Sequence, residues 1–387
     1  MAKLIDITGK ALSGEWGTDD ETGNGVPVIR TTNFTNEGVV NYKDVVTRTI
    51  NKKNIEEKFL RKGDIIIEKS GGSDKFPVGR VIYFDGKENT YLFNNFTGLL
   101  RVKNQEVWYP RYVFYSLFDN YKRGGTRAFE NKTTGLHNLK IDDYIFRYEV
   151  AEIDIAEQMF ICDLLDKLYG IIKLRMEELQ LLDDLIKARF VEMFGDVKYG
   201  IERWGGKPFK DIAINLDSKR KPVKDADRKK MQGIYPYYGA TGIVDYVNDY
   251  RQDGEFLLIS EDGKALELRS KPIAFLASGK IWINNHAHVQ QCTDECNIIY
   301  LMYHINFMDV SIWVTGIDQK KLNRANLNTI PIALPPIELQ KQFADFVKQV
   351  DKSKVLSETH IFYAEKSITP TTPEIFLKGR CIYGNEF

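Results

Sequence analysis

The feature that most constrains this chain is an internal repeat, in which two strand-rich halves align at a shift of roughly 190 residues. Gly63-Asp64-Ile65-Ile66-Ile67 corresponds to Gly254-Glu255-Phe256-Leu257-Leu258, and Phe93-Asn94-Asn95 corresponds to Ile283-Asn284-Asn285. Further matches pair Thr134-Gly135-Leu136 with Thr315-Gly316-Ile317, Ile153-Asp154-Ile155 with Ile337-Glu338-Leu339, and Gln158 with Gln342. The repeat predicts two similar domains, and the order along the chain is β-rich, helical, β-rich, helical.

Each half consists of short apolar runs bounded by turn residues, such as GDIIIEKSGGSD and GEFLLIS, which is typical of β-strands. Some helix is expected at 109–121. Between about residues 153 and 194 the only glycine is Gly170 and there is no proline, so a long helix is predicted. At ~1.5 Å per residue this helix would span about 60 Å, which suits a spacer. One apolar seam runs along it at heptad spacing, interrupted by Arg175 and Arg189, and comprises Leu165, Leu168, Ile172, Leu179, Leu182, Ile186 and Met193.

A second helix is predicted after Pro335-Pro336, because proline suits the first turn of a helix. Its apolar pattern ends near Val355. The remaining residues include Pro370 and Pro373 and show no heptads, so an irregular tail is expected.

Charge is unevenly distributed along the chain. The 387 residues carry 54 basic and 54 acidic side chains, which argues against a uniformly basic nucleic-acid coat or a polybasic membrane anchor. Residues 1–150 hold 23 basic and 20 acidic side chains, 151–196 hold 5 and 11, 197–335 hold 19 and 16, and 336–387 hold 7 and 7. Two mildly basic halves suit contact with DNA phosphates. The acidic helix is either an ordinary solvated surface or a surface for a partner protein.

Two local clusters of cations are the candidate DNA contacts. In the second half Lys219, Arg220, Lys221, Lys224, Arg228, Lys229 and Lys230 precede a loop with Tyr235, Tyr237 and Tyr238. In the first half Lys52, Lys53, Lys58, Arg61, Lys62 and Lys69 precede Ser70-Gly71-Gly72, where glycine permits close approach of the backbone to a partner. Lysine and arginine on loops position a protein on phosphates. The alternative for either cluster is a solvated face.

The sequence gives little support for a metal site or for an enzyme active site. His286, His288, Cys292 and Cys296 are zinc-type ligands close together, but their spacing is not that of a zinc finger. Histidines two residues apart on a strand share one face, where packing or hydrogen bonding is common. The sequence lacks G-x-S-x-G, Walker, G-x-G-x-x-G and H-E-x-x-H motifs. We therefore expect no bound metal and no catalytic centre.

The sequence has no signal-peptide pattern and no stretch of ~20 uncharged apolar residues, so a cytoplasmic protein is expected. Its four cysteines are too few and too scattered for a disulfide framework.

Several ordered runs resemble the specificity subunits of type I restriction–modification systems. They are PYYGATGIVDY, SGKIWINNHAHV and TGIDQKKLNRANLNTIPIALPPIELQKQF in the second half and, more loosely, GDIIIEKSGGS and LFNNFTGLLRV in the first. The resemblance covers about residues 1–354. It implies an α+β fold with two similar β-rich target recognition domains, separated by long helices that form an antiparallel coiled coil. The domains would be 1–150 and 197–334, with a central helix at 151–196, a shortened distal helix at 335–354 and an irregular tail at 355–387.

The resemblance also implies a function. The chain would bind double-stranded DNA sequence-specifically at a bipartite site and direct methyltransferase and restriction subunits, without catalytic activity or a cofactor of its own. S-adenosylmethionine, ATP and Mg²⁺ would bind to the partner subunits only. To the cation clusters it adds Ser278, Lys280, Asn285, His286 and His288 as candidate DNA contacts. The shortened distal helix predicts incomplete docking of a second methyltransferase subunit. The alternative function is a duplicated protein-binding scaffold without DNA activity.

Overall fold

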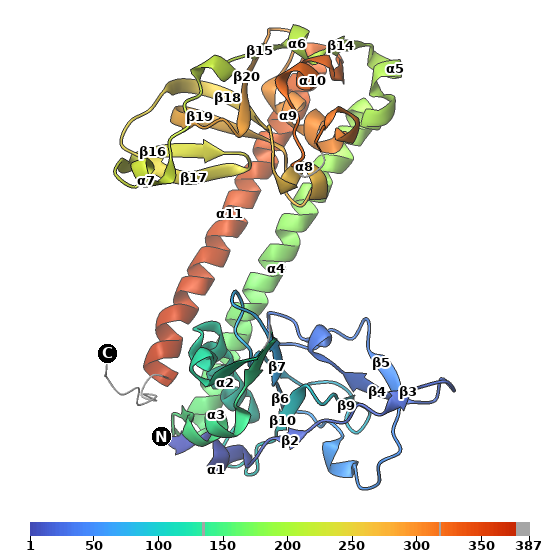
Figure 1. Ribbon diagram of the computed structural model, residues 1–387, viewed down its shortest axis with the longest axis vertical. Coiled ribbons are helices and arrows are strands. Elements are labelled where there is room, and N and C mark those ends of the chain that lie inside the picture. The colour runs from blue at the N-terminus through green and yellow to red at the C-terminus, as the bar shows by residue number, and fades with distance from the viewer. Residues whose placement is uncertain (134–135, 317–318, 377–387) are drawn as a thin grey trace. The chain divides into compact units, whose positions relative to one another are not determined.

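The computed structural model describes residues 1–133, 136–316 and 319–376, which form two compact units (Figure 1). Unit 1 comprises Met1–Arg175 and the described part of His360–Phe387, and unit 2 comprises Met176–Thr359. Two long helices, α4 (Ile155–Phe194) and α11 (Ile337–Phe376), each contribute one portion to unit 1 and one to unit 2.

Unit 1 is built on an antiparallel sheet of strand order β2-β10-β6-β8, formed by Leu12–Ser13, Thr97–Leu100, Ile65–Glu68 and Val81–Tyr83. A second sheet has the order β3-β5-β4-β9, formed by Thr18–Asp19, Val46–Thr49, Val26–Ile29 and Leu92–Phe93. Smaller sheets join β11 (Glu130–Thr133), β12 (Leu136–Leu139) and β7 (Ser70–Gly72), and β1 (Ala2–Lys3) with β13 (Glu149–Val150). Its shorter helices are α1 (Leu4–Thr8), α2 (Pro110–Lys122), α3 (Ile141–Arg147), and the 3₁₀ turns η1 (Thr31–Asn33), η2 (Glu56–Lys58) and η3 (Gly125–Phe129).

Unit 2 contains one sheet of order β15-β20-β18-β19-β16-β17, formed by Ala213–Asn215, Ala287–Cys292, Gln252–Ser260, Ala274–Ile283, Gln232–Gly239 and Gly242–Val247. β14 (Gly206–Pro208) pairs with β21 (Pro331–Ala333). The remaining elements are α5 (Gly200–Trp204), α6 (Phe209–Ile212), α7 (Asp225–Arg228), α8 (Lys264–Leu268), α9 (Ile298–Phe307), α10 (Arg324–Thr329), η4 (Val197–Tyr199), η5 (Asp217–Lys219) and η6 (Ser311–Trp313).

The two units share one strand order, which confirms the predicted internal repeat. The predicted pairing of Gly63–Ile67 with Gly254–Leu258 is one residue out of register, because Leu99 pairs with Ile66 as Val289 pairs with Leu258. The order β2-β10-β6-β8 in unit 1 is matched by β15-β20-β18-β19 in unit 2. β4 runs parallel to β9 as β16 runs parallel to the end of β19. After these strands Asn94 donates its backbone N–H to the carbonyl of Ile29, as Asn284 does to that of Tyr238. The correspondence of Thr134-Gly135-Leu136 with Thr315-Gly316-Ile317 falls partly outside the described residues.

The predicted register of the repeat at the helix starts is wrong by two residues. The structural counterpart of Gln158 is Gln340, and Gln342 is exposed. The buried Gln158 side chain donates to the carbonyls of Val107 (2.8 Å) and Ile153 (2.9 Å) and accepts the N–H of Tyr109 (2.8 Å). The buried Gln340 side chain likewise donates to the carbonyls of Glu295 (3.2 Å) and Pro335 (2.7 Å) and accepts the N–H of Asn297 (2.8 Å). Tyr109 and Asn297 are the N-cap residues of α2 and α9, so each glutamine joins a long helix to its unit.

The predicted seam of α4 faces the interior of both units. Leu165 lies in the core of unit 1 and Ile186 in that of unit 2, and both are fully buried. The other seam residues are partly buried, namely Leu168, Ile172, Leu179, Leu182 and Met193. Within unit 2, Phe343 packs on Phe190, while Lys354 is paired with Asp183. Residue numbers increase along α11 from Phe343 to Lys354 while those of their partners on α4 decrease from Phe190 to Asp183. The two helices are therefore antiparallel there.

The predictions of a short distal helix at 335–354 and an irregular tail at 355–387 are wrong for the described residues. α11 has 40 residues, as α4 does, and continues to Phe376. Beyond Val355 its buried face carries small or polar residues in place of a heptad. Ser357 is buried and donates its hydroxyl to Glu178 (2.9 Å), Ala364 is buried, and Ile368 packs against the core of unit 1. Residues 377–387 of the predicted tail lie outside the described residues.

Among the described residues, no helix combines the length and the apolar character needed to cross a bilayer.

Candidate nucleic-acid interface

The basic loop of unit 2 is held by its backbone, which leaves its lysine side chains exposed. Trp282 donates its indole N–H to the carbonyl of Lys221 (2.7 Å), and the Lys221 N–H bonds the carbonyl of Ile283 (3.2 Å). Gln252 donates its side-chain amide to the carbonyl of Lys219 (3.1 Å). Lys219 and Lys221 are therefore fixed where β18 begins and β19 ends, and both ammonium groups are free to meet a partner.

Two residues that sequence reasoning missed, Arg251 and Tyr250, extend this surface. The Lys280 ammonium lies 4.9 Å from the centre of the Tyr250 ring, and the Arg251 guanidinium lies 5.6 Å from that of Trp282. Arg251, Lys280 and Tyr250 are all exposed. Lys219, Lys221, Arg251, Lys280 and Tyr250 form the basic face of unit 2. An interleaving of cations and aromatic rings suits contact with sugar and phosphate. The only signal in the sequence was the pair Tyr250-Arg251 directly before a strand.

A network of ion pairs and hydrogen bonds lies next to the basic face of unit 2. It includes two of the predicted DNA contacts, Arg220 and His288. Arg220 pairs with Glu261 (2.6 Å) and Asp217 (3.5 Å), and it donates to the carbonyl of Ala287 (3.0 Å). His288 is fully buried, with Nδ1 2.7 Å from the Asp217 carboxylate and Nε2 2.8 Å from the carbonyl of Leu322. Arg220 and His288 therefore stabilise unit 2 through internal partners. Their assignment as DNA contacts is wrong. Burial raises the pKa of Asp217, but its hydrogen bonds with His288 and the Val289 N–H outweigh this and lower the pKa to about 2.

Tyr237 and Tyr238, which were predicted as DNA contacts, also pack into unit 2. Tyr237 is buried, and its hydroxyl accepts the N–H of Val223 (2.9 Å), so its assignment as a DNA contact is wrong. Tyr238 is half-buried with its ring 6.2 Å from that of Phe275.

The remaining predicted DNA contacts of unit 2 differ in whether their side chains are exposed or paired. Ser278, Asn285, Lys224 and Lys230 are exposed. His286 is exposed but bonded to Asp262 (2.8 Å). Arg228 pairs with Asp225 and Asp245, and Lys229 pairs with Asp225. The charges of Arg228 and Lys229, near the end of the predicted cation cluster, are thus neutralised by aspartates.

In unit 1 the predicted cluster divides into paired and unpaired cations. Lys52 and Lys58 both pair with Glu15, and hydrogen bonds from these two lysines lower the pKa of that carboxyl group. Lys69 is half-buried, with its ammonium 3.2 Å from the hydroxyl of Ser13, and burial lowers its pKa. Ser70 is half-buried within β7, whereas Lys53 is exposed.

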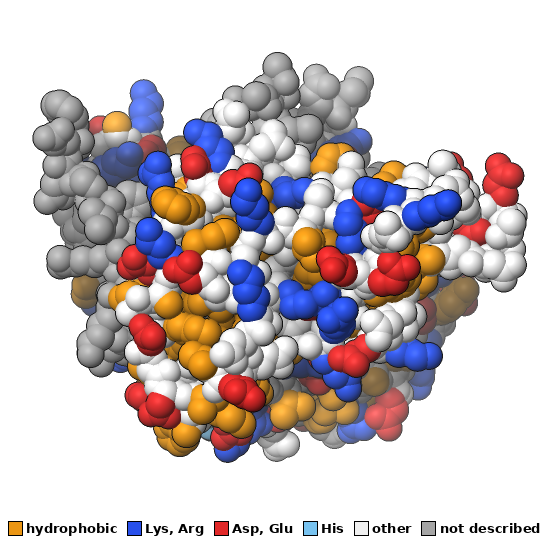
Figure 2. All heavy atoms as spheres, turned by 90° about the horizontal axis from the view of Figure 1, so that it is seen from below, with side chains coloured by type: hydrophobic (Ala, Val, Ile, Leu, Met, Phe, Trp, Pro, Cys, Tyr) orange, Lys and Arg blue, Asp and Glu red, His pale blue; other side chains and the backbone are white. Residues whose placement is uncertain are grey.

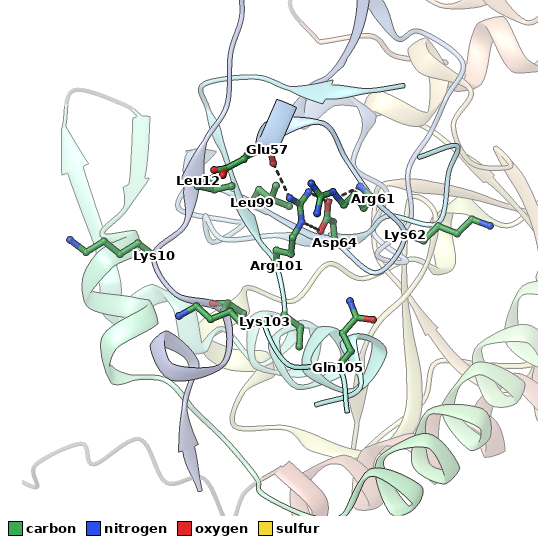
Figure 3. A pocket seen from close by; sticks show the side chains of 12 residues that line it. Lys10, Leu12, Glu57, Arg61, Lys62, Asp64, Leu99, Arg101, Lys103 and Gln105 are labelled. Carbon is green, nitrogen blue, oxygen red and sulfur yellow. Dashed lines mark hydrogen bonds and ion pairs between the residues drawn. The ribbon is translucent and has the colours of Figure 1, made fainter. Parts of the chain in front are cut away.

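Arg61 and Lys62 line a pocket of about 660 Å³, and its other cations were not foreseen (Figure 3). Lys10 and Lys103 extend along one side of this pocket, and Lys62 points away on the other. Arg101 is bound to the buried Asp64 carboxylate (2.7 and 2.6 Å) and to the carbonyls of Glu57 and Phe59. In the part of the chain that the structure describes, no carboxylate lies within 4.0 Å of the charged groups of Lys10, Arg61, Lys62 or Lys103. We call these four cations the basic face of unit 1.

The space-filling view that looks onto unit 1 shows Lys and Arg side chains gathered near the middle of the face (Figure 2). Arg61 and Lys62 stand just before β6, as Arg251 stands just before β18. The two basic faces therefore occupy the same end of equivalent strands in the repeat.

The four zinc-type residues do not converge on one point. Both ring nitrogens of His288 already have partners, and His286 is bonded to Asp262. A hydrogen bond with Cys292, together with burial, raises the pKa of the Cys296 thiol well above its usual range. Among the described residues no group of three or more histidines, cysteines or carboxylates could hold a metal ion.

Two repeated β-rich units, each with cations at one end of its sheet that lack a carboxylate partner among the described residues, are thus joined to the same pair of long helices. The family model described as the type I restriction modification DNA specificity domain matches residues 2–182 and 201–361. The chain therefore belongs to the type I restriction–modification DNA specificity family. Specificity subunits are the non-catalytic components of these systems.

Two curated relatives carry corresponding names. A putative type I restriction enzyme specificity subunit of Haemophilus influenzae, S.HindORF215P, is 38% identical over 151 residues, which is 39% of this chain and 37% of that protein. The EcoprrI specificity subunit of Escherichia coli is 26% identical over 125 residues, or 32% of this chain and 30% of that protein. These matches thus span about a third of each relative's length.

A solved structure shows a similar fold over nearly the whole chain. The S subunit of a type I restriction–modification system from M. genitalium matches with a TM-score of 0.60 and 15% identity, over 97% of this chain and 95% of that one. At this identity the similarity supports the fold alone.

Proposed function

We propose that this chain is the DNA-recognition subunit of a type I restriction–modification complex, in which each unit binds one half of a bipartite double-stranded site. The observation that carries the proposal is the repetition of an unpaired basic face at the same end of the equivalent sheets. Non-specific affinity would come from Lys10, Arg61, Lys62 and Lys103 in unit 1 and from Lys219, Lys221, Arg251 and Lys280 in unit 2. The exposed polar side chains Asn285 and Ser278 are candidates for contacts with base edges.

The chain would guide chemistry that its partners perform. A second apolar stripe on α4, next to the buried seam, supports a surface for the methyltransferase subunit. In unit 1 it consists of Phe160, Leu164, Ile171 and Leu174, all exposed, and in unit 2 the same spacing continues with Leu181 and Leu185. The restriction subunit would join through that complex. S-adenosylmethionine, ATP and Mg²⁺ would bind to the partner subunits, and this chain would need no cofactor.

The test of DNA binding is the salt dependence of affinity for a random-sequence duplex. A protein that neutralises Z phosphates loses affinity with a slope of about −0.9Z in log K against log salt. We expect Lys219→Ala combined with Lys221→Ala to make this slope shallower by ~1 to 2. Lys229→Ala, which removes a cation already paired with Asp225, is the matched control and should change the slope little. Binding that is absent, or independent of salt, would favour the protein-binding scaffold.

Specificity has its own test. Methylome mapping of the source cell should show one bipartite motif that disappears when this gene is deleted. A methylated motif in one continuous block would contradict reading by two units.

A further inference from the structure

Unit 1 has a second basic pocket, at the opposite end of its sheet from Arg61 and Lys62. It lies between the loop that joins β7 to β8 and the C-terminal end of α2, and its volume is about 470 Å³. Four cations line it, namely Lys75, Lys122, Arg123 and Arg127, together with Phe76 and Tyr121. No carboxylate is among its described lining residues.

The loop is held in one conformation by hydrogen bonds. The Arg127 guanidinium donates to the carbonyls of Asp74 (3.3 Å) and Lys75 (3.2 Å). Ser73 donates its N–H to the carbonyl of Phe76 (2.7 Å), and the Phe76 N–H returns to the Ser73 hydroxyl (3.2 Å). This closed turn presents the Phe76 ring to solvent with 60% of the residue exposed, and the Lys75 ammonium lies 5.1 Å from the ring centre. The ring and the cations are therefore preorganised.

The positive charge of the pocket is compensated only in part, by the ion pair of Arg123 with Asp119 (2.9 Å). Among the described residues, no carboxylate lies within 4.0 Å of the charged groups of Lys75, Lys122 or Arg127. Burial lowers the pKa of Lys122, and the attraction of Glu37 only partly opposes this shift. The negative end of the α2 dipole favours Lys122 and Arg123 at the helix terminus. It does not account for Lys75 on the loop or Arg127 on η3, and both side chains are exposed and available to an anion outside the protein.

We propose that this pocket binds a backbone phosphate of DNA, with Phe76 against the adjacent deoxyribose. The assignment rests on the proposed function and adds a second contact for unit 1. β6 has four residues, so at ~3.3 Å per residue the strand itself spans about 13 Å between these two ends of the sheet. One turn of duplex DNA is about 34 Å long, so a single half-site can reach both.

Unit 2 provides an internal comparison, because the pocket at its equivalent loop is lined by fewer cations and also by a carboxylate. The connection from β18 to β19 also exposes an apolar residue, Leu268. The end of α9 supplies Tyr303, Asn306 and Phe307 to this pocket, whose charged lining residues are Arg269, Lys271 and Asp183. Lys264 and Lys271 on this loop are exposed and serve as matched sites for charge removal.

The experiment measures binding of the full-length chain to a random-sequence duplex across a salt series. We expect Lys75→Ala combined with Lys122→Ala to make the slope of log K against log salt shallower by ~1 to 2, and Lys264→Ala combined with Lys271→Ala to leave it unchanged. Phe76→Ala should weaken binding severalfold at every salt concentration without changing the slope, and Leu268→Ala should have no effect. Circular dichroism establishes that each variant is folded.

The outcomes separate the two proposals. If the unmodified chain binds with a salt-dependent slope, but the unit 1 variant matches it or matches the unit 2 control, the pocket is not a DNA site while the proposed function stands. If the unmodified chain shows no salt-dependent binding, both proposals fail.

Discussion

Replacing Gln340 with alanine should destabilise unit 2, because this buried side chain satisfies three backbone groups at once. It donates to the carbonyls of Glu295 and Pro335 and accepts the N–H of Asn297, which begins α9. Each buried group left without a partner costs about 1–3 kcal/mol. Part of that cost is relieved by water, and the lost side chain adds a small cavity, so we expect a loss of about 3–5 kcal/mol in the free energy of unfolding. A loss of that size is a large share of the ~5–15 kcal/mol that stabilises a typical domain.

The chain contains a matched control for this substitution. Gln342 is the same residue type on the same helix, two positions further on, and is exposed. Gln342→Ala should stay within about 0.5 kcal/mol. The measurement is hydrogen exchange in the native state, because a chain with two units need not unfold in one step. The Asn297 amide should lose protection in Gln340→Ala and keep it in Gln342→Ala. Equal protection in the two variants would refute the assignment of Gln340 as the joint.

Three further substitutions test the packing and the buried charges. His304 is buried and neither ring nitrogen has a hydrogen-bond partner, so burial lowers its pKa to about 4. Because the pKa of histidine in the unfolded chain is about 6.5, the free energy of unfolding should fall by up to ~1.4 kcal/mol per pH unit as the pH is lowered from 6.5 to 4. His304→Met should remove that part of the acid sensitivity, as measured by urea unfolding at pH 7 and pH 4.5. An unchanged acid loss would show that His304 is not its source. The Asp217 carboxylate, with its pKa of about 2, contributes stability above pH 3.8 that is lost as the pH falls toward 2. Asp217→Asn should cost about 3 kcal/mol at pH 7, because it leaves His288 without its charged partner, and should increase protease cleavage near Lys219. A variant as stable and as resistant as the parent would contradict this. Ile186→Ala should cost about 2–4 kcal/mol and the neighbouring exposed Leu185→Ala less than about 1 kcal/mol in thermal unfolding, and a reversed order would mean that the seam is misassigned.

The sequence was sufficient for the elements whose pattern is local. The runs around Ile66 and Leu257 became the central strands β6 and β18, and the long segment free of proline became α4. The repeat was visible because Asn94 and Asn284 mark the same turn in both halves. The register of the glutamine was missed because the connections between strand and helix differ in length between the halves, and the partners of Gln340 are backbone atoms that leave no trace in the sequence.

The side of the sheet on which a residue lies could not be predicted. Alternation identifies an outward face only when one side of a sheet meets water. In unit 2, Leu257 packs in one core cluster and its neighbour Leu258 in another, so both faces are covered. The same covering buries His288 and Tyr237, which were predicted from the sequence as DNA contacts. Lys10 and Lys103 were missed for another reason: they are isolated in sequence and meet Arg61 only after folding.

The distal helix shows how a heptad rule can fail. Beyond Val355 the small residues Ser357 and Ala364 occupy buried positions of α11 where a heptad pattern would have large apolar side chains. A pattern built on leucine spacing therefore ended the helix too early.

The glutamine joint has a consequence for how the two halves can diverge. Gln158 and Gln340 contact only main-chain atoms of the segments they bind, so the joint imposes no requirement on the side chains there. Tyr109 in one half and Asn297 in the other are chemically unlike, yet they fill the same position. Each head can accumulate substitutions, or be exchanged for another, while its attachment to the helix is preserved. In each half, one glutamine side chain thus provides an attachment that does not depend on the side chains it meets.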